Sequence, residues 1–168
     1  MPQRFAQDRA ALDARWKELQ REAHPDRFAA QGAAAQRLAM QWSVRINEAY
    51  QRLKDPLKRA AYLCELAGAP VNAQSNTAMP AQFLMQQMQW RETLDDATCL
   101  TDIDAVQAEV QGAHAQLLVQ CGDLLDAQGD APRAVACVRA LMFIERFAAD
   151  LEQRAEKLES GAGAWAGH

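Results

Sequence analysis

The chain has 168 residues, a net charge of −4 and only 7% aromatic residues. Val, Ile and Tyr are scarce while Ala, Leu, Gln, Glu and Arg abound, and this composition favours helices over sheet. No apolar run approaches the roughly 18 residues of a membrane span, and no signal peptide opens the sequence. We therefore expect an all-α, cytoplasmic protein with no membrane contact.

The charge differs in sign between the two parts of the chain. Residues 1–60 carry a net charge of +5, whereas residues 61–168 carry −9. A basic part of this kind can meet an acidic partner surface. Nucleic acid is the alternative partner, but acidic residues are interleaved with the basic ones and the chain has no RNA- or DNA-binding motif. We expect no nucleic-acid partner.

The first part of the chain predicts two helices joined by a turn. Asp8 is suited to cap the first helix, and Pro25 ends it because the residue before a proline is pushed out of the α region. A second helix follows from about Ala33. Apolar residues at spacings of three and four define the facing sides, which are Leu12, Trp16, Leu19 and Ala23 on the first helix and Leu38, Trp42, Ile46, Ala49, Tyr50 and Leu53 on the second.

A short helix and a linker follow the predicted hairpin. Asp55 can cap this helix with Pro56 in its first turn, and Gly68 closes it. Prolines and small polar residues then indicate a linker. The predicted division of the chain is a first domain over residues 1–68, the linker over 69–80, a second domain over 81–160 and a flexible tail over 161–168.

The second domain predicts three longer helices, over residues 80–97, 102–127 and 131–159. Asp102 can cap the second helix and Asp130 the third. Apolar residues repeat three and four apart along both, which indicates a three-helix bundle. The seam residues are Ile103, Val106, Val110, Leu117, Cys121 and Leu124 on the second helix, and Ala134, Cys137, Leu141, Ile144, Ala148, Leu151, Ala155 and Leu158 on the third.

The first helix of the bundle carries two apolar faces. One face suffices as a core stripe and consists of Phe83, Trp90, Leu94 and Ala97. The other consists of Leu84, Met85 and Met88, with Glu92 and Asp96 near them, and Phe143 lies off the seam of its own helix and could join this patch. These residues either pack under the linker or against the first domain, or they form a docking surface, for which flexible methionines are suited.

The cysteines and histidines predict no metal site. No C-x-x-C pair is present and the histidines are widely scattered, so zinc binding is not indicated. We expect reduced thiols, no metal and no cofactor. The residues concerned are Cys64, Cys99, Cys121, Cys137, His24, His114 and His168.

The motifs of the first part resemble those of a J-domain. His24-Pro25-Asp26 stands in the turn after a basic helix, and Asn-Glu-Ala-Tyr followed by Asp-Pro ends the second helix. The segments AAYLCELAG and FLMQQMQWRETLDD extend the likeness, and they are similar to the HscB family, the J-type co-chaperones of iron–sulfur cluster assembly. The resemblance covers the chain to about residue 158. It implies an L-shaped arrangement of a J-domain hairpin and a three-helix bundle.

The resemblance implies regulation of a partner rather than catalysis. In the family, the turn and the basic helix dock on a DnaK-type chaperone, HscA, and stimulate its ATP hydrolysis, while the bundle binds the scaffold protein IscU. The chaperone-binding positions matched here are His24, Pro25, Asp26, Arg15, Lys17, Arg21 and Arg27. The scaffold-binding positions matched here are Leu84, Met85, Met88, Glu92, Asp96 and Phe143. One further family contact, commonly acidic, is Gln89 in this chain.

Other functions are weighed against this one. An enzyme that uses His24 and Asp26 as an acid–base pair is disfavoured, because no nucleophile, glycine-rich loop or ligand cluster accompanies them. A J-domain co-chaperone with a different client is the first alternative. A helical scaffold without chaperone function is the second.

The chain departs from the family where it begins. Family members begin with a short aromatic-rich helix that packs across the hairpin, and Met1 stands where that helix should end. We expect the true start to lie upstream. Without that helix, part of the apolar face around Leu12, Trp16 and Trp42 is expected to be exposed.

Overall fold

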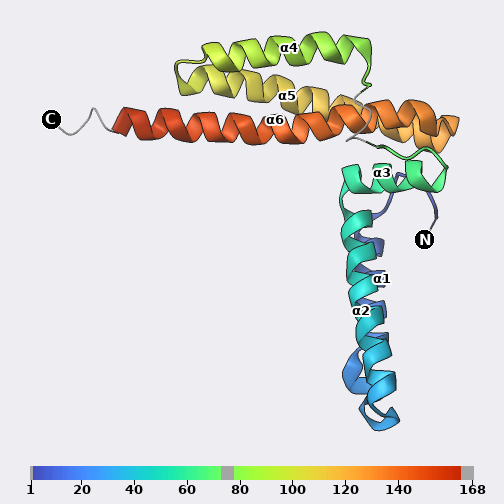
Figure 1. Cartoon of the computed structure of the whole chain (residues 1–168). Coiled ribbons are helices and arrows are strands. Elements are labelled where there is room, and N and C mark those ends of the chain that lie inside the picture. Colours follow the sequence, from blue (N-terminus) through green and yellow to red (C-terminus); the bar gives the residue numbers. More distant parts are fainter. Residues whose placement is uncertain (1, 73–77, 164–168) are drawn as a thin grey trace.

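The computed structural model describes residues 2–72 and 78–163, and that part of the chain is helical without a strand. A helical hairpin stands across a three-helix bundle, which gives the molecule an L shape (Figure 1). The predicted all-α class and the L-shaped pairing of hairpin and bundle are therefore confirmed. The helices are α1 (Arg9–Glu22), α2 (Ala33–Lys54), α3 (Pro56–Leu66), α4 (Ala81–Asp96), α5 (Leu100–Gly122) and α6 (Ala131–Gly163).

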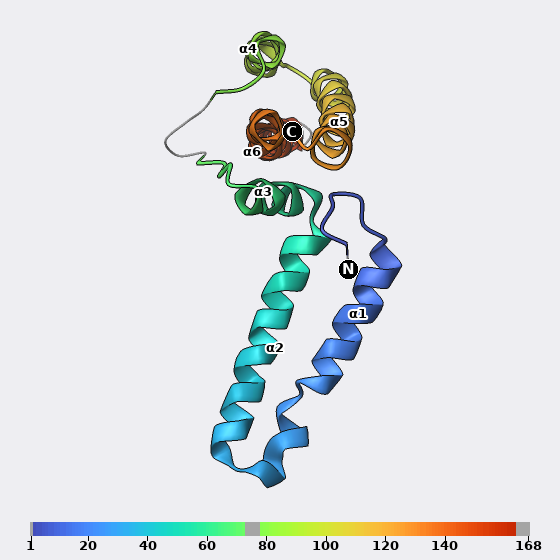
Figure 2. The same cartoon turned by 90° about the vertical axis from the view of Figure 1, so that its right-hand side faces the viewer.

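The hairpin consists of α1 and α2, which run side by side (Figure 2). The Asp8 carboxylate accepts a hydrogen bond from the Ala11 N–H at 3.1 Å and caps α1, as predicted. After α1, a short 3₁₀-helix, η1 (Pro25–Gln31), turns the chain back. Gly32 then opens α2 with a φ of 94°, a backbone angle that favours glycine because other residues meet steric strain there.

α3 joins the two arms of the molecule. The Asp55 carboxylate accepts hydrogen bonds from the N–H groups of Leu57 and Lys58 at 2.9 and 3.1 Å, so it caps α3 as predicted. α3 packs against α6, and Leu57, Ala60 and Cys64 enter the same core as the bundle. The short helix therefore joins the hairpin to the bundle (Figure 2).

The hydrophobic core lies in the bundle and follows the predicted seams. The predicted seam residues of the second bundle helix are all buried. On α6, the seam is buried from Ala134 to Leu151, except that Ala148 is half-buried, as are Ala155 and Leu158 nearer the end. Burial of these apolar side chains supplies the main stabilisation, because each removes apolar surface from water.

One helix cap differs from the prediction. Asp102 does not precede its helix but lies in the first turn of α5, where its carboxylate accepts hydrogen bonds from the N–H groups of Thr98 and Cys99 at 3.0 and 3.1 Å. α5 therefore begins at Leu100, and it continues into a π-helix, η2 (Asp123–Gln128). Asp130 caps α6 as predicted, since its carboxylate accepts a hydrogen bond from the Arg133 N–H at 3.1 Å.

A buried arginine holds both ends of the predicted linker. The Arg139 guanidinium donates two hydrogen bonds to the Val71 carbonyl, at 2.9 and 2.7 Å, and one to the Ala78 carbonyl, at 3.3 Å. Residues 73–77 of the linker lie outside the described residues. At the other end of the chain, α6 continues to Gly163, so the predicted tail begins as helix; residues 164–168 also lie outside the described part.

Candidate functional site

The His24-Pro25-Asp26 turn lies at the end of the hairpin farthest from the bundle (Figure 1). The Asp26 N–H donates to His24 Nδ1 at 3.3 Å, so the imidazole caps η1. Pro25 occupies the first position of η1, where its fixed φ suits the turn. The side chains of His24 and Asp26 are 58% and 89% exposed, with 3.7 Å between Nδ1 and the nearer carboxylate oxygen. The turn therefore exposes a compact polar pair at the surface.

Side chains of α1 and α2 hold this turn in place. The Ser43 hydroxyl donates to the Ala23 carbonyl at 3.0 Å, immediately before the turn. The Gln20 side-chain amide donates to the Ser43 carbonyl at 3.1 Å and to the Asn47 side chain at 2.8 Å, and the Trp16 indole N–H also donates to Asn47, at 2.9 Å. Sequence reasoning missed these positioning residues. Polar residues four apart on facing helices are the signal that could have indicated them.

The four basic residues predicted to bind the chaperone are exposed, and their contacts differ. Arg15 pairs with Glu18 at 2.5 Å on the same helix. The Arg27 guanidinium donates to the Arg21 carbonyl at 3.3 Å, near the C-terminal end of α1, where a positive charge is stabilising. Arg27 therefore also fastens the turn to α1. The Arg21 guanidinium donates to the Lys17 carbonyl on its own helix at 3.4 Å, and Lys17 is exposed.

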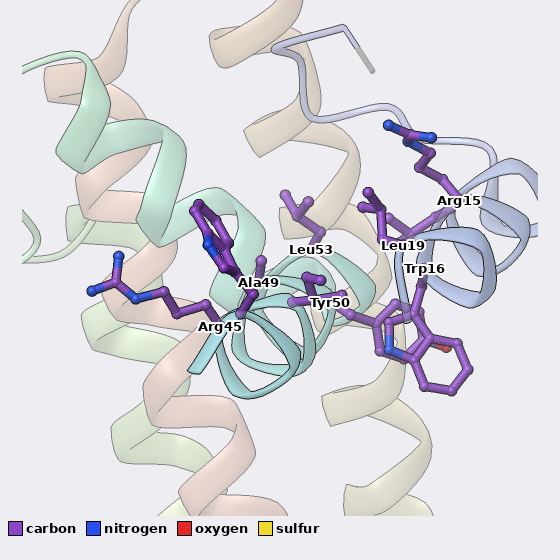
Figure 3. Close-up of a pocket in the computed structure, with 10 residues that line it drawn as sticks. Arg15, Trp16, Leu19, Arg45, Ala49, Tyr50 and Leu53 are labelled. Carbon is purple, nitrogen blue, oxygen red and sulfur yellow. The ribbon is translucent and has the colours of Figure 1, made fainter. Parts of the chain in front are cut away.

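An apolar groove runs between α1 and α2 (Figure 3). Trp42 and Leu12 both line it; Trp42 is 54% exposed, while Leu12 is buried. This agrees with the expectation that part of the hairpin's apolar face is uncovered. Arg15 of α1 and Arg45 of α2 border the groove, which is lined further by Trp16, Leu19, Ile46, Ala49, Tyr50 and Leu53.

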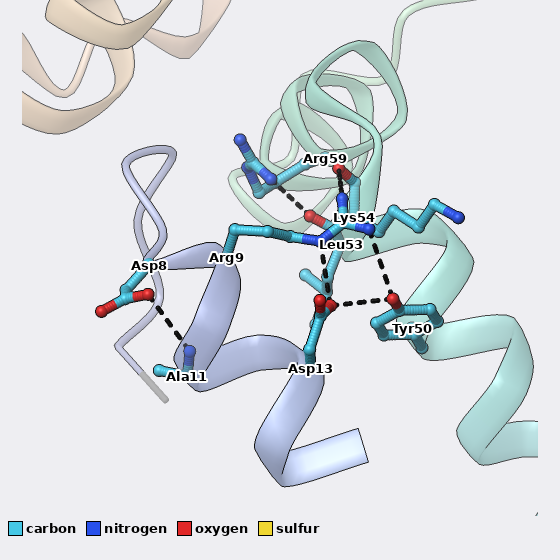
Figure 4. A network of polar contacts seen from close by, with 8 residues as sticks. All are labelled: Asp8, Arg9, Ala11, Asp13, Tyr50, Leu53, Lys54 and Arg59. Carbon is cyan, nitrogen blue, oxygen red and sulfur yellow. Dashed lines mark hydrogen bonds and ion pairs between the residues drawn. The ribbon is translucent and has the colours of Figure 1, made fainter. Parts of the chain in front are cut away.

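A polar network ties α1 to α2 at the end of the hairpin nearer the bundle (Figure 4). The Tyr50 hydroxyl donates to the Asp13 carboxylate at 2.8 Å, and the Arg9 guanidinium donates to the same carboxylate at 2.9 Å and to the Lys54 carbonyl at 3.4 Å. The hydrogen bond from Tyr50 lowers the pKa of Asp13, and the same bond raises the pKa of Tyr50. The Tyr50 ring also stacks on Trp16, with ring centroids 4.7 Å apart.

The second candidate surface is the outer face of α4, which lies on the side of the bundle away from the hairpin (Figures 1 and 2). Leu84, Met85 and Met88 are 39%, 76% and 70% exposed. Glu92 and Asp96, on the same face, are exposed as well. We call these five residues the α4 patch. They do not pack against the hairpin, so the alternative in which the first domain covers them does not hold.

Phe143 lies in the core beneath α4 and is not part of the α4 patch. The prediction that it lies away from the core face of α6 is therefore wrong. The ring is 9% exposed, meets Phe83 edge-on with centroids 5.7 Å apart and stacks on Phe147 at 5.8 Å. The Arg91 guanidinium lies over it, 5.2 Å from the ring centroid. The physical reason is that α6 packs against α3, α4 and α5, so it buries a wider face than one seam.

Three of the four cysteines belong to the core. Cys64, Cys121 and Cys137 are buried, whereas Cys99 is exposed. Burial raises the pKa of Cys64 to about 11 and that of Cys121 to about 12. Over residues 2–72 and 78–163, no group of three or more His, Cys, Asp or Glu side chains is arranged to hold a metal ion, and no helix is both long and apolar enough to cross a bilayer.

Comparison with known proteins shows which family the chain belongs to. Residues 79–152 match the family described as the HSCB C-terminal oligomerisation domain. The chain is 49% identical over 163 residues to the "Co-chaperone protein HscB homolog" of Burkholderia multivorans, covering 95% of this chain and 93% of that protein. It is 48% identical over 162 residues to the protein of the same name from Burkholderia thailandensis, covering 95% and 92%.

Solved structures agree with this result. The structure of chaperone HscB from Vibrio cholerae superposes with a TM-score of 0.79 at 33% identity, covering 94% of each chain. Human co-chaperone HscB has the same fold, with a TM-score of 0.82 at 24% identity, covering 91% of this chain and 77% of that one. These likenesses place the chain in a class of co-chaperones in which a helical hairpin is joined to a helical bundle. Within that class, the chain belongs to the HscB family.

Proposed function

We propose that this chain stimulates the ATPase of an HscA-type chaperone of the DnaK class and delivers an IscU-type scaffold protein to it, in the maturation of iron–sulfur proteins. The observation that carries the proposal is the separation of two exposed surfaces. The His24-Pro25-Asp26 turn lies at the tip of the hairpin, and the exposed residues of the α4 patch belong to α4, which lies on the side of the bundle away from the hairpin (Figure 1). Two partners can therefore bind the same chain at once.

The chemistry of the turn suits a docking role. His24 and Asp26 offer a donor–acceptor pair of fixed spacing to a partner. Basic side chains on α1 increase the rate of association with an acidic surface, because complementary charge steers the encounter. The chain then acts on the partner's hydrolysis through binding, without a covalent step or a cofactor of its own.

The chemistry of the α4 patch suits a protein partner. Leu84, Met85 and Met88 provide exposed apolar surface whose burial against a partner favours association. The carboxylates of Glu92 and Asp96 at the edge favour a partner with basic residues opposite them. Phe143 contributes from beneath α4, by supporting the backbone on which the patch is displayed.

Steady-state ATP turnover by an HscA-type chaperone tests the proposal. Turnover is measured for the chaperone alone, with this chain, with the IscU-type scaffold, and with both. We expect the chain to raise turnover and the scaffold to raise it further. Stimulation by the chain that is indifferent to the scaffold would instead indicate a co-chaperone for a different client, and turnover unchanged by the chain would refute the proposal.

A further inference from the structure

The segment that precedes α1 is fastened to the far arm of the molecule. The backbone N–H groups of Phe5 and Ala6 donate hydrogen bonds to the two carboxylate oxygens of Asp126, at 2.5 and 2.8 Å. Asp126 lies in η2, which packs against α3 and α6. One carboxylate therefore holds two consecutive backbone donors at the surface between the two arms.

The Phe5 ring adds two contacts at the same place. A Cβ atom on Gly122 would lie 3.0 Å from Cδ1 of Phe5, so the ring packs closely against the backbone of Gly122. The Arg59 guanidinium of α3 lies over the ring, 5.0 Å from its centroid, which is a favourable cation–π geometry. Arg59 also donates to the Leu53 carbonyl near the end of α2 (Figure 4).

These contacts give the hairpin a second attachment to the bundle. On one side, α2 continues through Asp55 into α3, which is packed on α6. On the other side, α1 is preceded by the segment that Asp126 holds. A hairpin attached through α2 alone could turn about the single connection at Asp55, as hinged domains do. The second attachment, on the α1 side, removes that freedom.

We infer that Asp126 is a positioning residue, which fixes the angle between hairpin and bundle by holding the backbone of Phe5 and Ala6. It thereby fixes the place of the His24-Pro25-Asp26 turn relative to the α4 patch. The functional consequence rests on the proposed function, because it concerns a chaperone bound at the turn and a scaffold bound at the patch. When the Asp126 carboxylate is removed, the turn and the α4 patch stay intact. Their position relative to each other is no longer fixed.

Distances between spin labels test the structural part of this inference in the full chain. The exposed Cys99 carries one label, and Gln31→Cys, at the exposed end of η1, carries the other; the remaining cysteines are buried. We expect a narrow distance distribution for this parent and a broader one for Asp126→Ala.

Asp123→Ala is the matched control, since Asp123 also lies in η2 but accepts its hydrogen bond from Gln128. We expect this variant to keep the narrow distribution. A distribution for Asp126→Ala that is as narrow as that of the parent, at a temperature where both are folded, overturns the inference. So does an equal broadening by Asp123→Ala, because the effect would then belong to η2 as a whole.

ATP turnover tests the functional part. In Asp126→Ala, stimulation by the chain alone and affinity for the scaffold should stay at the parent level, while the additional stimulation by the scaffold is lost. If Asp126 only stabilised the fold, its loss would lower stimulation by the chain alone and affinity for the scaffold together with the additional stimulation by the scaffold. Unchanged joint stimulation in Asp126→Ala contradicts the positioning role. If the parent chain itself fails to stimulate the chaperone, the proposed function fails, and the label distances still decide whether Asp126 fixes the angle.

Discussion

The Ser43 hydroxyl on α2 donates a hydrogen bond to the carbonyl oxygen of Ala23, the residue immediately before His24. The bond is half-buried and joins residues that are 20 positions apart in the chain. It fixes the point at which α1 ends and the exposed turn begins. The position of the turn is therefore set by the neighbouring helix as well as by Pro25.

Replacing Ser43 with alanine should loosen the turn. The Ala23 carbonyl then loses its partner, so we expect the free energy of unfolding to fall by about 1 kcal/mol. Stimulation of the chaperone ATPase should fall as well, because the His24 and Asp26 side chains are no longer held in one place. Urea unfolding and ATP turnover measure the two effects. Ser43→Thr keeps a hydroxyl and is the control; equal stimulation by parent and Ser43→Ala would contradict the role of this bond.

The α4 patch and Phe143 should respond differently to truncation. Leu84→Ala combined with Met85→Ala should weaken binding of the scaffold and leave the melting temperature near that of the parent, because both side chains are exposed. Phe143→Ala should lower the free energy of unfolding by about 3–5 kcal/mol, as expected for a buried aromatic residue. Titration calorimetry and thermal unfolding measure these outcomes.

Val119→Ala is the matched control for the patch, since Val119 is an exposed apolar residue of α5 outside it. It should leave scaffold binding unchanged. A large loss of stability in the Leu84 and Met85 variant would show that these residues belong to the core after all. Loss of binding in Val119→Ala would show that the binding surface extends beyond α4.

The thiols should divide into one reactive and three protected groups. Thiolate is the reactive form, and burial raises the pKa of Cys64 to about 11 and of Cys121 to about 12, so these residues are unreactive at neutral pH. We expect Ellman's reagent to modify Cys99 alone in the folded chain and all four cysteines in denaturant. Cys99→Ser, which should abolish the reaction of the folded chain, is the control. Rapid modification of a second thiol would contradict the packing of the core.

The Asp13–Tyr50 hydrogen bond should make the stability of the hairpin depend on pH. The pKa of Asp13 is lowered below 3.8 in the folded chain, chiefly by the Tyr50 hydroxyl. The contribution of the ionised carboxylate is therefore present above that pH and is lost as the pH falls through the lowered value. We expect the melting temperature of Asp13→Asn to fall less steeply with decreasing pH than that of the parent. If the melting temperatures of Asp13→Asn and the parent fall equally in acid, the hydrogen bond contributes nothing to stability.

The sequence was sufficient to predict the helices and most of their caps, because helices and caps depend on residues within one or two helical turns of each other. Phe143 was misplaced because one helix viewed alone does not show how many neighbours pack around it. The bonds from Ser43 to Ala23 and from Phe5 to Asp126 were missed because they join residues far apart in the chain. The α4 patch was predictable, since an apolar stripe beyond the core stripe is visible on a helical wheel.

The separation of the two surfaces is tested most directly by His24→Gln in the full chain. ATP turnover of the HscA-type chaperone and affinity for the IscU-type scaffold are measured on the same preparation. We predict that His24→Gln loses stimulation of the chaperone and binds the scaffold as tightly as the parent, because the turn and the α4 patch lie on different arms of the molecule. Equal loss of both activities, in a variant that keeps its melting temperature, would contradict this prediction.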